Sequence, residues 1–258
     1  MSAMKQKLRA GDVVYGQMIL ELFSPGIAPM LSNAGLDFVI YDMEHGRCDI
    51  NLVSQMIMSC RGTRLTPIVR VPDQYHFPLS RVLDVGARGV MIPRVETGEQ
   101  MRDVVAQLKY APQGRRGVAL GLAHDDYQPR GAAYFEEANN ETVVIAIVET
   151  ARALENLDAI VSSPGLDIAW MGHYDLTVSL GIPAQFDHPR FLEAMAALVA
   201  SCRRHGVTAG FLPASAQDTV RWIHQGFHAI CLGTDVGVFS KAVSQFHSAV
   251  LRQMGETQ

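Results

Sequence analysis

Eight short apolar runs recur along this chain of 258 residues, and longer stretches whose apolar residues have helical spacing separate them. The runs are rich in Val, Ile and Phe and nearly continuous in apolar character, which is typical of parallel strands covered by helices. They are Val13–Leu20, Phe38–Glu44, Pro67–Val71, Gly89–Val95, Val143–Glu149, Leu166–Gly172, Thr208–Leu212 and Ala229–Gly233. This alternation matches the size and pattern of a (β/α)8 barrel. We therefore predict an α/β fold, a single TIM-barrel domain over residues 1–258.

Helical patterns between the runs agree with this prediction. Apolar residues line one face of Ile50–Cys60 and of Pro189–His205. Ser215 is a suitable cap for a helix over Ala214–Gln225. A doubly wound sheet is the structural alternative, but no Gly-x-Gly-x-x-Gly follows the first run. The connection Ala111–Thr142 breaks the rhythm, and a loop of that length is usually functional or disordered.

Charge, hydropathy and cysteine content exclude several classes of protein. The 22 basic and 26 acidic residues give a net charge of −4, and no long basic block points to nucleic acid. No apolar run approaches the roughly 18 residues of a membrane helix. The 4 cysteines lie too far apart for a zinc site or a disulfide framework. No secretory signal is apparent, so we expect a soluble, cytoplasmic protein with no nucleic-acid or membrane partner.

Lysine is scarce in this chain. Only four of the 22 basic residues are lysine, namely Lys5, Lys7, Lys109 and Lys241. A Schiff-base mechanism needs a lysine beside the reacting carbonyl. TIM-barrel enzymes build their active sites at the carboxyl ends of the strands, and no lysine lies at such an end here. The sequence therefore disfavours Schiff-base catalysis.

Two acidic residues stand at neighbouring strand ends. Glu149 ends the fifth run and Asp175 follows the sixth, so both carboxylates reach the same end of the barrel. Carboxylates that lie close together raise each other's pKa unless a cation lies between them. Their oxygen atoms suit Mg²⁺, Mn²⁺ or Co²⁺. The alternative is a pair of helix-capping or interface acids, because a helix can begin directly after Glu149.

Three further residues have both a functional and a structural interpretation. Arg70 is the only cation in an apolar strand, so it either binds a carboxylate or enolate oxygen or forms a structural ion pair. His45 ends Asp-Met-Glu-His and is either a general base or acid or an ordinary core histidine. Asp84, near the third predicted helix, can orient an imidazole or carry a solvated surface charge.

These residues belong to a series of motifs that resembles the HpcH/HpaI aldolase family, whose members are metal-dependent pyruvate aldolases. The resemblance covers most of the chain, from about Leu8 to Val250, and several motifs occur in the same order. The motifs are Asp42-Met-Glu-His45, Pro67-Ile-Val-Arg70-Val-Pro, Leu83-Asp84-Val-Gly-Ala, Tyr110-Ala-Pro-Gln-Gly-Arg-Arg-Gly117, Val148-Glu149-Thr150, Gly172-His-Tyr-Asp175-Leu and Gly210-Phe-Leu212.

The resemblance implies a metal centre and a catalytic base. Glu149 and Asp175 would be the protein ligands of the metal, with water and a 2-oxo acid at its other positions. Arg70 would stabilise the oxyanion of the enolate. His45, oriented by Asp84, would act as the base.

The resemblance also implies how substrate and subunits are held. Main-chain groups around Gly172, His173 and Tyr174 would bind the carboxylate of the 2-oxo acid. Leu212 would line the donor or aldehyde pocket. Members of the family form hexamers, trimers of dimers in which the last helix is exchanged between neighbours. The segment Phe239–Met254 is long and amphipathic enough to do this.

Two positions depart from the pattern of the family. Ile147 stands where the family often has Gln, two residues before the metal-binding Glu. His173 stands where the family commonly has Pro, in Gly-Pro-x-Asp. The first change removes a donor to the bound oxo acid, and the second adds a titratable group beside Asp175. We expect the metal centre to remain and the substrate preference to shift, toward hydroxypyruvate.

The sequence is therefore interpreted as that of a divalent-metal-dependent aldolase, a carbon–carbon lyase. It would reversibly cleave a 4-hydroxy-2-oxo acid into a 2-oxo acid, pyruvate or hydroxypyruvate, and an aldehyde, through an enolate on the metal. An oxaloacetate decarboxylase or a related enolate lyase is the first alternative. A non-catalytic oligomeric barrel that binds a small acid is the second.

Overall fold

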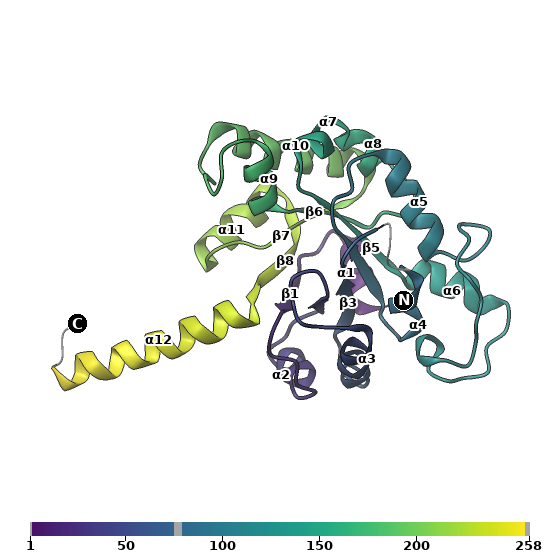
Figure 1. The fold of residues 1–258 in the computed structure, drawn as a ribbon, viewed down its shortest axis with the longest axis horizontal. Coiled ribbons are helices and arrows are strands. Elements are labelled where there is room, and N and C mark those ends of the chain that lie inside the picture. Colours follow the sequence, from purple (N-terminus) through teal and green to yellow (C-terminus); the bar gives the residue numbers. More distant parts are fainter. Residues whose placement is uncertain (1, 75–78, 256–258) are drawn as a thin grey trace.

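The computed structural model describes residues 2–74 and 79–255, whose arrangement Figure 1 shows. Eight parallel strands form a closed barrel in which neighbours in the chain pair with each other and β8 pairs with β1. The strands are β1 (Val14–Ile19), β2 (Phe38–Asp42), β3 (Thr66–Arg70), β4 (Gly89–Ile92), β5 (Val143–Val148), β6 (Ile168–Met171), β7 (Thr208–Phe211) and β8 (Phe227–Thr234). Each predicted run overlaps one of them. The closed barrel confirms the predicted (β/α)8 fold and excludes the doubly wound sheet, which has open edges.

The strands are apolar throughout because both of their faces are covered. In β2, Phe38 and Ile40 belong to the core inside the barrel. The alternate residues Val39 and Tyr41 belong to the layer between barrel and helices. Successive side chains of a strand point to opposite faces, so a doubly covered strand needs apolar residues at every position. This is the physical origin of the continuous apolar runs.

Most of the helices surround the barrel and cover its outer face (Figure 1). The α-helices of the described residues are α1 (Ala3–Ala10), α2 (Ile27–Asn33), α3 (Ile50–Ser59), α4 (Ser80–Asp84), α5 (Gly98–Leu108), α6 (Ala133–Glu141), α7 (Ala151–Glu155), α8 (Leu157–Val161), α9 (His173–Ser179), α10 (Pro189–His205), α11 (Ala216–Gln225) and α12 (Asp235–Met254). The three internal helices predicted from spacing correspond to α3, α10 and α11. The predicted cap of α11 is formed, because Ser215 Oγ accepts a hydrogen bond from the N–H of Asp218.

The amino-terminal helix α1 closes the end of the barrel at which the strands begin. Met4 is fully buried and belongs to the core inside the barrel. Lys5 Nζ lies 2.9 Å from Asp167 Oδ1, and Lys7 Nζ lies 2.8 Å from Asp37 Oδ1. Each aspartate directly precedes a strand, so these ion pairs fasten α1 to this end, which we call the base of the barrel. The carboxyl ends of the strands form the opposite end, which we call the mouth.

The long connection before β5 is partly helical. It contains a 3-10 helix, Ala123–Asp125, and the helix α6. Lys109 Nζ donates hydrogen bonds to the main-chain oxygen atoms of Asn139 and Thr142, which fastens the end of α6 beside the end of α5. Burial lowers the pKa of Lys109 to about 8. The interpretation as one long loop missed α6 because its apolar face, formed by Tyr134, Phe135 and Ala138, is too short to give a clear helical period.

The carboxyl-terminal helix α12 extends away from the barrel as a single rod (Figure 1). It begins at Asp235, one turn earlier than the predicted Phe239. Its apolar residues Phe239, Val243, Phe246 and others are exposed. Within the described ranges, no helix has both the length and the apolar character needed to cross a membrane.

Candidate active site

Arg70 is fixed at the mouth by acidic residues that follow or end β2. Asp42 and Arg70 are the last residues of β2 and β3 and lie opposite each other in the strand register. Arg70 Nε and Nη2 donate to Asp42 Oδ1 and Oδ2 at 2.8 and 2.6 Å. Arg70 Nη1 lies 3.1 Å from Oε2 of Glu44. The bidentate pair fixes the plane of the guanidinium group, so the ion pair that is the structural alternative for Arg70 also positions its charge.

Glu44 completes the ion cluster around Arg70. Its side chain is largely buried, and burial raises its pKa, whereas the charges of Arg70 and then His45 act in the opposite direction. Its Oε2 atom is shielded from solvent and accepts no hydrogen bond of good geometry from the described residues. The Glu44 carboxylate therefore retains the capacity to accept a proton or a hydrogen bond from a bound molecule.

Glu149 lies directly after β5 and is almost completely buried, with 4% of its surface exposed. Its Oε1 atom accepts a hydrogen bond of 2.6 Å from the main-chain N–H of Arg94. Its pKa is raised to about 7, chiefly by burial and further by the negative charges of Glu44 and Asp175. A Cβ atom on Gly172 would lie 2.6 Å from Oε2 of Glu149, so a glycine is needed where the chain leaving β6 passes this carboxylate.

The surroundings of Glu149 fit a cation. Glu149 and Asp175 repel each other through the field that raises the pKa of Glu149, and a cation between them would relieve that repulsion. Gly172 leaves space beside the Oε2 atom that a side chain would fill. In the described part of the chain, no three His, Cys, Asp or Glu side chains form a metal-binding group. A cation here would thus have two carboxylate ligands and take its remaining ligands from water or substrate.

Asp175 is exposed and lies in the first turn of α9, so its charge also faces the positive end of this short helix. His173, two residues earlier, packs against the rings of Tyr174, Phe186 and Phe211 at centroid distances of 4.6, 5.3 and 5.2 Å. Burial lowers the pKa of His173 to about 4, and Asp175 opposes this effect. The imidazole is therefore neutral near pH 7.

His45 and Asp84 are not paired within one chain. The His45 side chain is 55% exposed, and its Nε2 atom lies 3.8 Å from Oε2 of Glu44. Asp84 is the last residue of α4, and its Oδ1 atom accepts a hydrogen bond of 2.7 Å from Arg116 Nη2. The Arg116 side chain is almost fully buried and needs a counter-charge, which Asp84 supplies. The expected orientation of His45 by Asp84 is therefore not formed within this chain.

The groups expected to bind the substrate lie just after β6, in the first turn of α9 and just after β7. The N–H of Gly172 already donates to the Val148 oxygen at 3.0 Å, so it is not available to a ligand. The N–H groups of His173 and Tyr174 belong to the first turn of α9, where no intrahelical acceptor exists. Leu212, just after β7, packs against the core inside the barrel. The N–H groups of His173 and Tyr174 and the side chain of Leu212 thus lie at the mouth, whereas the N–H of Gly172 is already bonded.

Two aspartates at the mouth have roles that sequence reasoning did not assign. Asp42 holds Arg70, and the signal that could have revealed it is the common end of two adjacent strands. Asp235 is buried and fixes the segment after β1. It accepts hydrogen bonds from three successive main-chain N–H groups, those of Leu20, Glu21 and Leu22, at 3.0, 3.0 and 2.6 Å.

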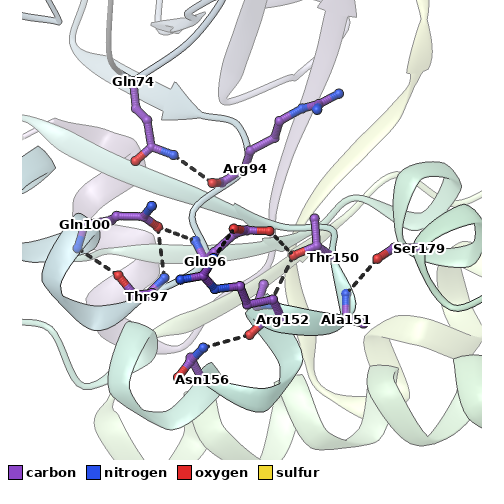
Figure 2. Close-up of polar contacts among 11 residues, drawn as sticks. Gln74, Arg94, Glu96, Thr97, Gln100, Thr150, Ala151, Arg152, Asn156 and Ser179 are labelled. Carbon is purple, nitrogen blue, oxygen red and sulfur yellow. Dashed lines mark hydrogen bonds and ion pairs between the residues drawn. The ribbon is translucent and has the colours of Figure 1, made fainter.

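The segments that follow β4 and β5 are cross-linked at the rim of the mouth, as Figure 2 shows. Thr150 Oγ1 donates to Glu96 Oε1 at 2.9 Å. Gln100 Oε1 accepts from the N–H groups of Glu96 and Thr97 at 2.8 and 3.0 Å. The main-chain oxygen of Arg94 accepts a hydrogen bond of 2.7 Å from Gln74 Nε2. This network holds the main chain that donates to Glu149.

Comparison with known proteins agrees with these observations. The family described as HpcH/HpaI aldolase/citrate lyase matches residues 17–242. A 2-keto-3-deoxy-L-rhamnonate aldolase of Klebsiella pneumoniae is 32% identical over 244 residues, 93% of this chain and 90% of the relative. A 5-keto-4-deoxy-D-glucarate aldolase of the same organism is 30% identical over 88% of this chain and 89% of the relative. The crystal structure of an HpcH/HpaI aldolase from Desulfitobacterium hafniense superimposes with a TM-score of 0.91 at 30% identity, covering 97% of each chain.

Proposed function

The chain belongs to the HpcH/HpaI aldolase/citrate lyase family and is a carbon–carbon lyase, and we propose that it reversibly cleaves a 4-hydroxy-2-oxo acid. The products are an aldehyde and a 2-oxo acid, pyruvate or hydroxypyruvate. The observation that carries this proposal is the fixed charge of Arg70 near Glu44 and Glu149. Burial raises the pKa values of these two acids. Such a site can stabilise an enolate and exchange protons near neutral pH.

The proposal includes a divalent cation, Mg²⁺, Mn²⁺ or Co²⁺, held by Glu149 and Asp175. Bound there, it would supply Lewis-acid polarisation of the 2-oxo group. Three observations support the assignment: Oε1 of Glu149 is engaged by the Arg94 N–H, its pKa is raised, and Gly172 leaves space beside Oε2. Asp175, which follows the next strand, β6, supplies a second carboxylate. The two residues together offer the oxygen ligands that such cations prefer.

Arg70 has the task of stabilising the oxyanion at C2 of the substrate. Both oxygen atoms of Asp42 hold its Nε and Nη2 atoms, so the guanidinium group does not reorganise when charge develops. The N–H groups of His173 and Tyr174 are proposed to bind the carboxylate at C1. Leu212 then lines the apolar side of the pocket.

His45 is proposed to move the proton. In the cleavage direction, its imidazole accepts the proton of the C4 hydroxyl group as the C3–C4 bond breaks, and the electron pair of that bond forms the enolate. Protonation at C3 then yields the 2-oxo acid. Glu44 lies 3.8 Å from the His45 ring and stabilises the charge that the ring acquires. Asp84 orients His45 only if it comes from another subunit.

Hydrogen exchange tests this function without knowledge of the aldehyde. The protein is incubated with pyruvate in D₂O, with and without added Mg²⁺, Mn²⁺ or Co²⁺, and the methyl proton signal is followed. We expect exchange that depends on the cation and stops with EDTA. An absence of exchange with pyruvate, hydroxypyruvate and 2-oxobutyrate alike would reject the aldolase proposal and favour a binding protein.

We also propose a homo-oligomer, a hexamer built as a trimer of dimers, in which α12 packs against a neighbouring copy. The exposed apolar residues Phe239, Val243, Phe246 and Val250 on α12 support this arrangement. Sedimentation of the purified protein measures its mass, and Phe246→Glu should dissociate the assembly. A monomeric wild-type protein would refute the proposal.

A further inference from the structure

A cavity of about 510 Å³ opens at the base of the barrel, at the opposite end of the strands from the mouth. The carboxyl-terminal ends of α1, α10 and α11 border it, together with the first residues of β7 and β8. Its size lies within the range of pockets that bind small ligands. No step of the proposed reaction uses this cavity, so its lining needs a separate explanation.

The charged and imidazole side chains that line this cavity are all basic. Arg9, Arg203 and His224 lie in the last turns of α1, α10 and α11. His228 is the second residue of β8. Among the described residues that line the cavity, none is acidic. Four basic side chains thus border a space that no carboxylate of the lining neutralises.

Arg203 shows this lack of a counter-charge most clearly. It is followed in α10 by Arg204 and His205, whose Nη2 and Nε2 atoms lie 2.6 and 2.9 Å from Asp158 Oδ1. The Arg203 guanidinium forms no ion pair or hydrogen bond with any residue that the structure describes. Its Nη2 atom lies instead 3.7 Å from the position that a Cβ atom on Gly226 would take. The side chain therefore crosses from α10 toward the end of α11 and carries its charge to the cavity.

Positive charges at the carboxyl ends of helices also offset the helix dipole, which is the structural alternative for these residues. In the same last turns, however, Lys7 accompanies Arg9 in α1, and Arg204 accompanies Arg203 in α10. Arg9 likewise forms no ion pair with the described part of the chain, whereas Lys7 pairs with Asp37. The helix dipoles thus do not by themselves require Arg9 and Arg203.

The floor of the cavity is apolar. Val199, Cys202 and Ala209 line it and are buried. The C-cap of α11, Gly226, has a φ of 112°, and a Cβ atom there would lie 2.8 Å from Cγ1 of Val199. A side chain at this position would therefore collide with the floor. Basic groups around an apolar floor suit an anion that is attached to a small apolar body.

A phosphate monoester has the charge and the geometry that this lining can recognise. Near pH 7 it carries a charge of about −1.5 to −2 and presents three acceptor oxygen atoms. The planar guanidinium group of arginine matches phosphate, and an imidazole ring donates a hydrogen bond even when it is neutral. A single carboxylate offers two oxygen atoms and one negative charge, which would leave part of the basic lining without a partner.

We propose that the cavity at the base binds a small phosphate monoester, with its phosphate against Arg9 and Arg203 and its organic group on the apolar floor. The bound molecule is an effector rather than a substrate, because Arg70 and Glu149 lie at the opposite end of the strands. Binding at the base needs no divalent cation. The proposal is therefore independent of the aldolase reaction and goes beyond it.

The test is calorimetric titration of the full-length protein in EDTA, which keeps phosphate from binding to a cation at the mouth. The probes are phenyl phosphate, inorganic phosphate, malonate and benzyl alcohol, so that the phosphate, carboxylate and apolar contributions are separated. The variants are Arg9→Gln, Arg203→Gln and the double variant. Arg102→Gln, an exposed arginine on α5, is the matched control. The single variants keep the test decisive if the double variant does not fold.

We expect one phenyl phosphate per chain, bound at least about tenfold more tightly than inorganic phosphate because its ring covers the apolar floor. Malonate should bind more weakly than phenyl phosphate, and benzyl alcohol should not bind. Each single variant should weaken phenyl phosphate binding by about three- to tenfold, and the double variant by more, because charge-assisted hydrogen bonds disappear. Arg102→Gln should bind as wild type does.

Three results would overturn the proposal. If wild type binds none of the probes, the arginines serve only the helix ends. Unchanged affinity in the variants would place the bound phosphate elsewhere on the protein. Malonate binding as tight as that of phenyl phosphate would reject phosphate as the recognised group. None of these results bears on the aldolase, which pyruvate exchange in D₂O tests separately.

Discussion

The base and the mouth of the barrel both hold acidic residues, but the partners of these residues differ. At the base, Asp37 is 1% exposed and accepts from Lys7 Nζ, Arg64 Nη2 and the N–H of Tyr15 at 2.8, 3.1 and 3.1 Å. Asp167 accepts from the N–H of Val144 at 2.9 Å and pairs with Lys5. Each of these carboxylates at the base is thus matched by cations and main-chain donors.

At the mouth the acids outnumber the cations around them. Asp42, Glu44 and Glu149 gather around Arg70, and Asp175 adds a further negative charge. Burial raises the pKa values of Glu44 and Glu149. Charges that are matched stabilise a fold, whereas charges left partly unmatched are available to a substrate or a cation. The difference indicates that the acidic residues of the base serve stability and that those of the mouth serve binding and catalysis.

The largest losses of stability and activity should come from removing the positive charge of Arg70 at the mouth. Arg70→Ala leaves the fully buried Asp42 without its partner, so we expect unfolding in urea to show a loss of about 3–5 kcal/mol. Pyruvate exchange should fall by at least about a hundredfold, because the oxyanion loses its fixed charge. The double variant Arg70→Ala/Asp42→Asn should regain stability but no exchange. If stability and pyruvate exchange recovered equally in the double variant, Arg70 would act only as the structural partner of Asp42.

Glu149→Gln tests whether the ionised carboxylate of Glu149 destabilises the folded protein. The pKa of Glu149 rises from 4.5 to about 7 on folding, so the folded protein holds this proton more tightly than the unfolded chain does. The corresponding stability is present below pH 4.5 and is lost as the pH rises toward 7. In EDTA, wild type should therefore lose about 2–3 kcal/mol more than the variant between pH 5 and pH 8. Parallel stability curves for the two proteins would contradict the raised pKa.

The same variant reports on the cation. The amide oxygen that Glu149→Gln introduces would still accept from the Arg94 N–H, so the main chain keeps its bond while the negative charge disappears. We expect the purified variant to retain less divalent metal after dialysis than wild type. Unchanged metal content would remove Glu149 from the proposed centre, whatever the stability curves show.

The fold was predictable from sequence because parallel strands buried on both faces leave continuous apolar runs. In β5 all six residues are buried, and the run Val143–Val148 is apolar throughout. The helix α6 was missed because its apolar contacts form only a small cluster around Tyr110, and hydrogen bonds of Asn139 to Lys109 and Tyr110 complete its attachment. Hydrogen bonds between distant segments leave no period in the sequence.

The sequence identified those residues of the site that lie at strand ends, but it did not reveal their contacts. Glu149 and Arg70 were candidates because each is a charged residue at the end of an apolar run. The same signal marks Arg94, which follows Met-Ile-Pro, but its left-handed main chain and the hydrogen bond of its N–H to Glu149 appear only in three dimensions. The pairing of Asp84 with Arg116 also depends on tertiary contacts, so sequence order could not reveal it.

At the base, Asp37→Asn should destabilise the protein without affecting catalysis. The amide cannot match two cations and a main-chain donor at once, so we expect a loss of about 1.5–3 kcal/mol in the free energy of unfolding. The kcat/KM of aldol cleavage should stay within about twofold of wild type, because the base lies at the opposite end of the strands from the mouth. A large loss of activity in well-folded protein would break the division between the two ends.

The smallest change in the free energy of unfolding should come from Lys7→Ala. The Lys7 side chain is 36% exposed and that of Arg64 is 46% exposed, and both donate to the same Oδ1 atom of Asp37. Removing either cation leaves the other in place, so each single variant should lose at most about 1 kcal/mol in urea unfolding. The double variant should lose more than the sum of the two single losses, because the N–H of Tyr15 is then the one donor to Asp37 that remains among the described residues. Additive losses would mean that Lys7 and Arg64 act independently. Neither cation would then compensate for the loss of the other at Asp37.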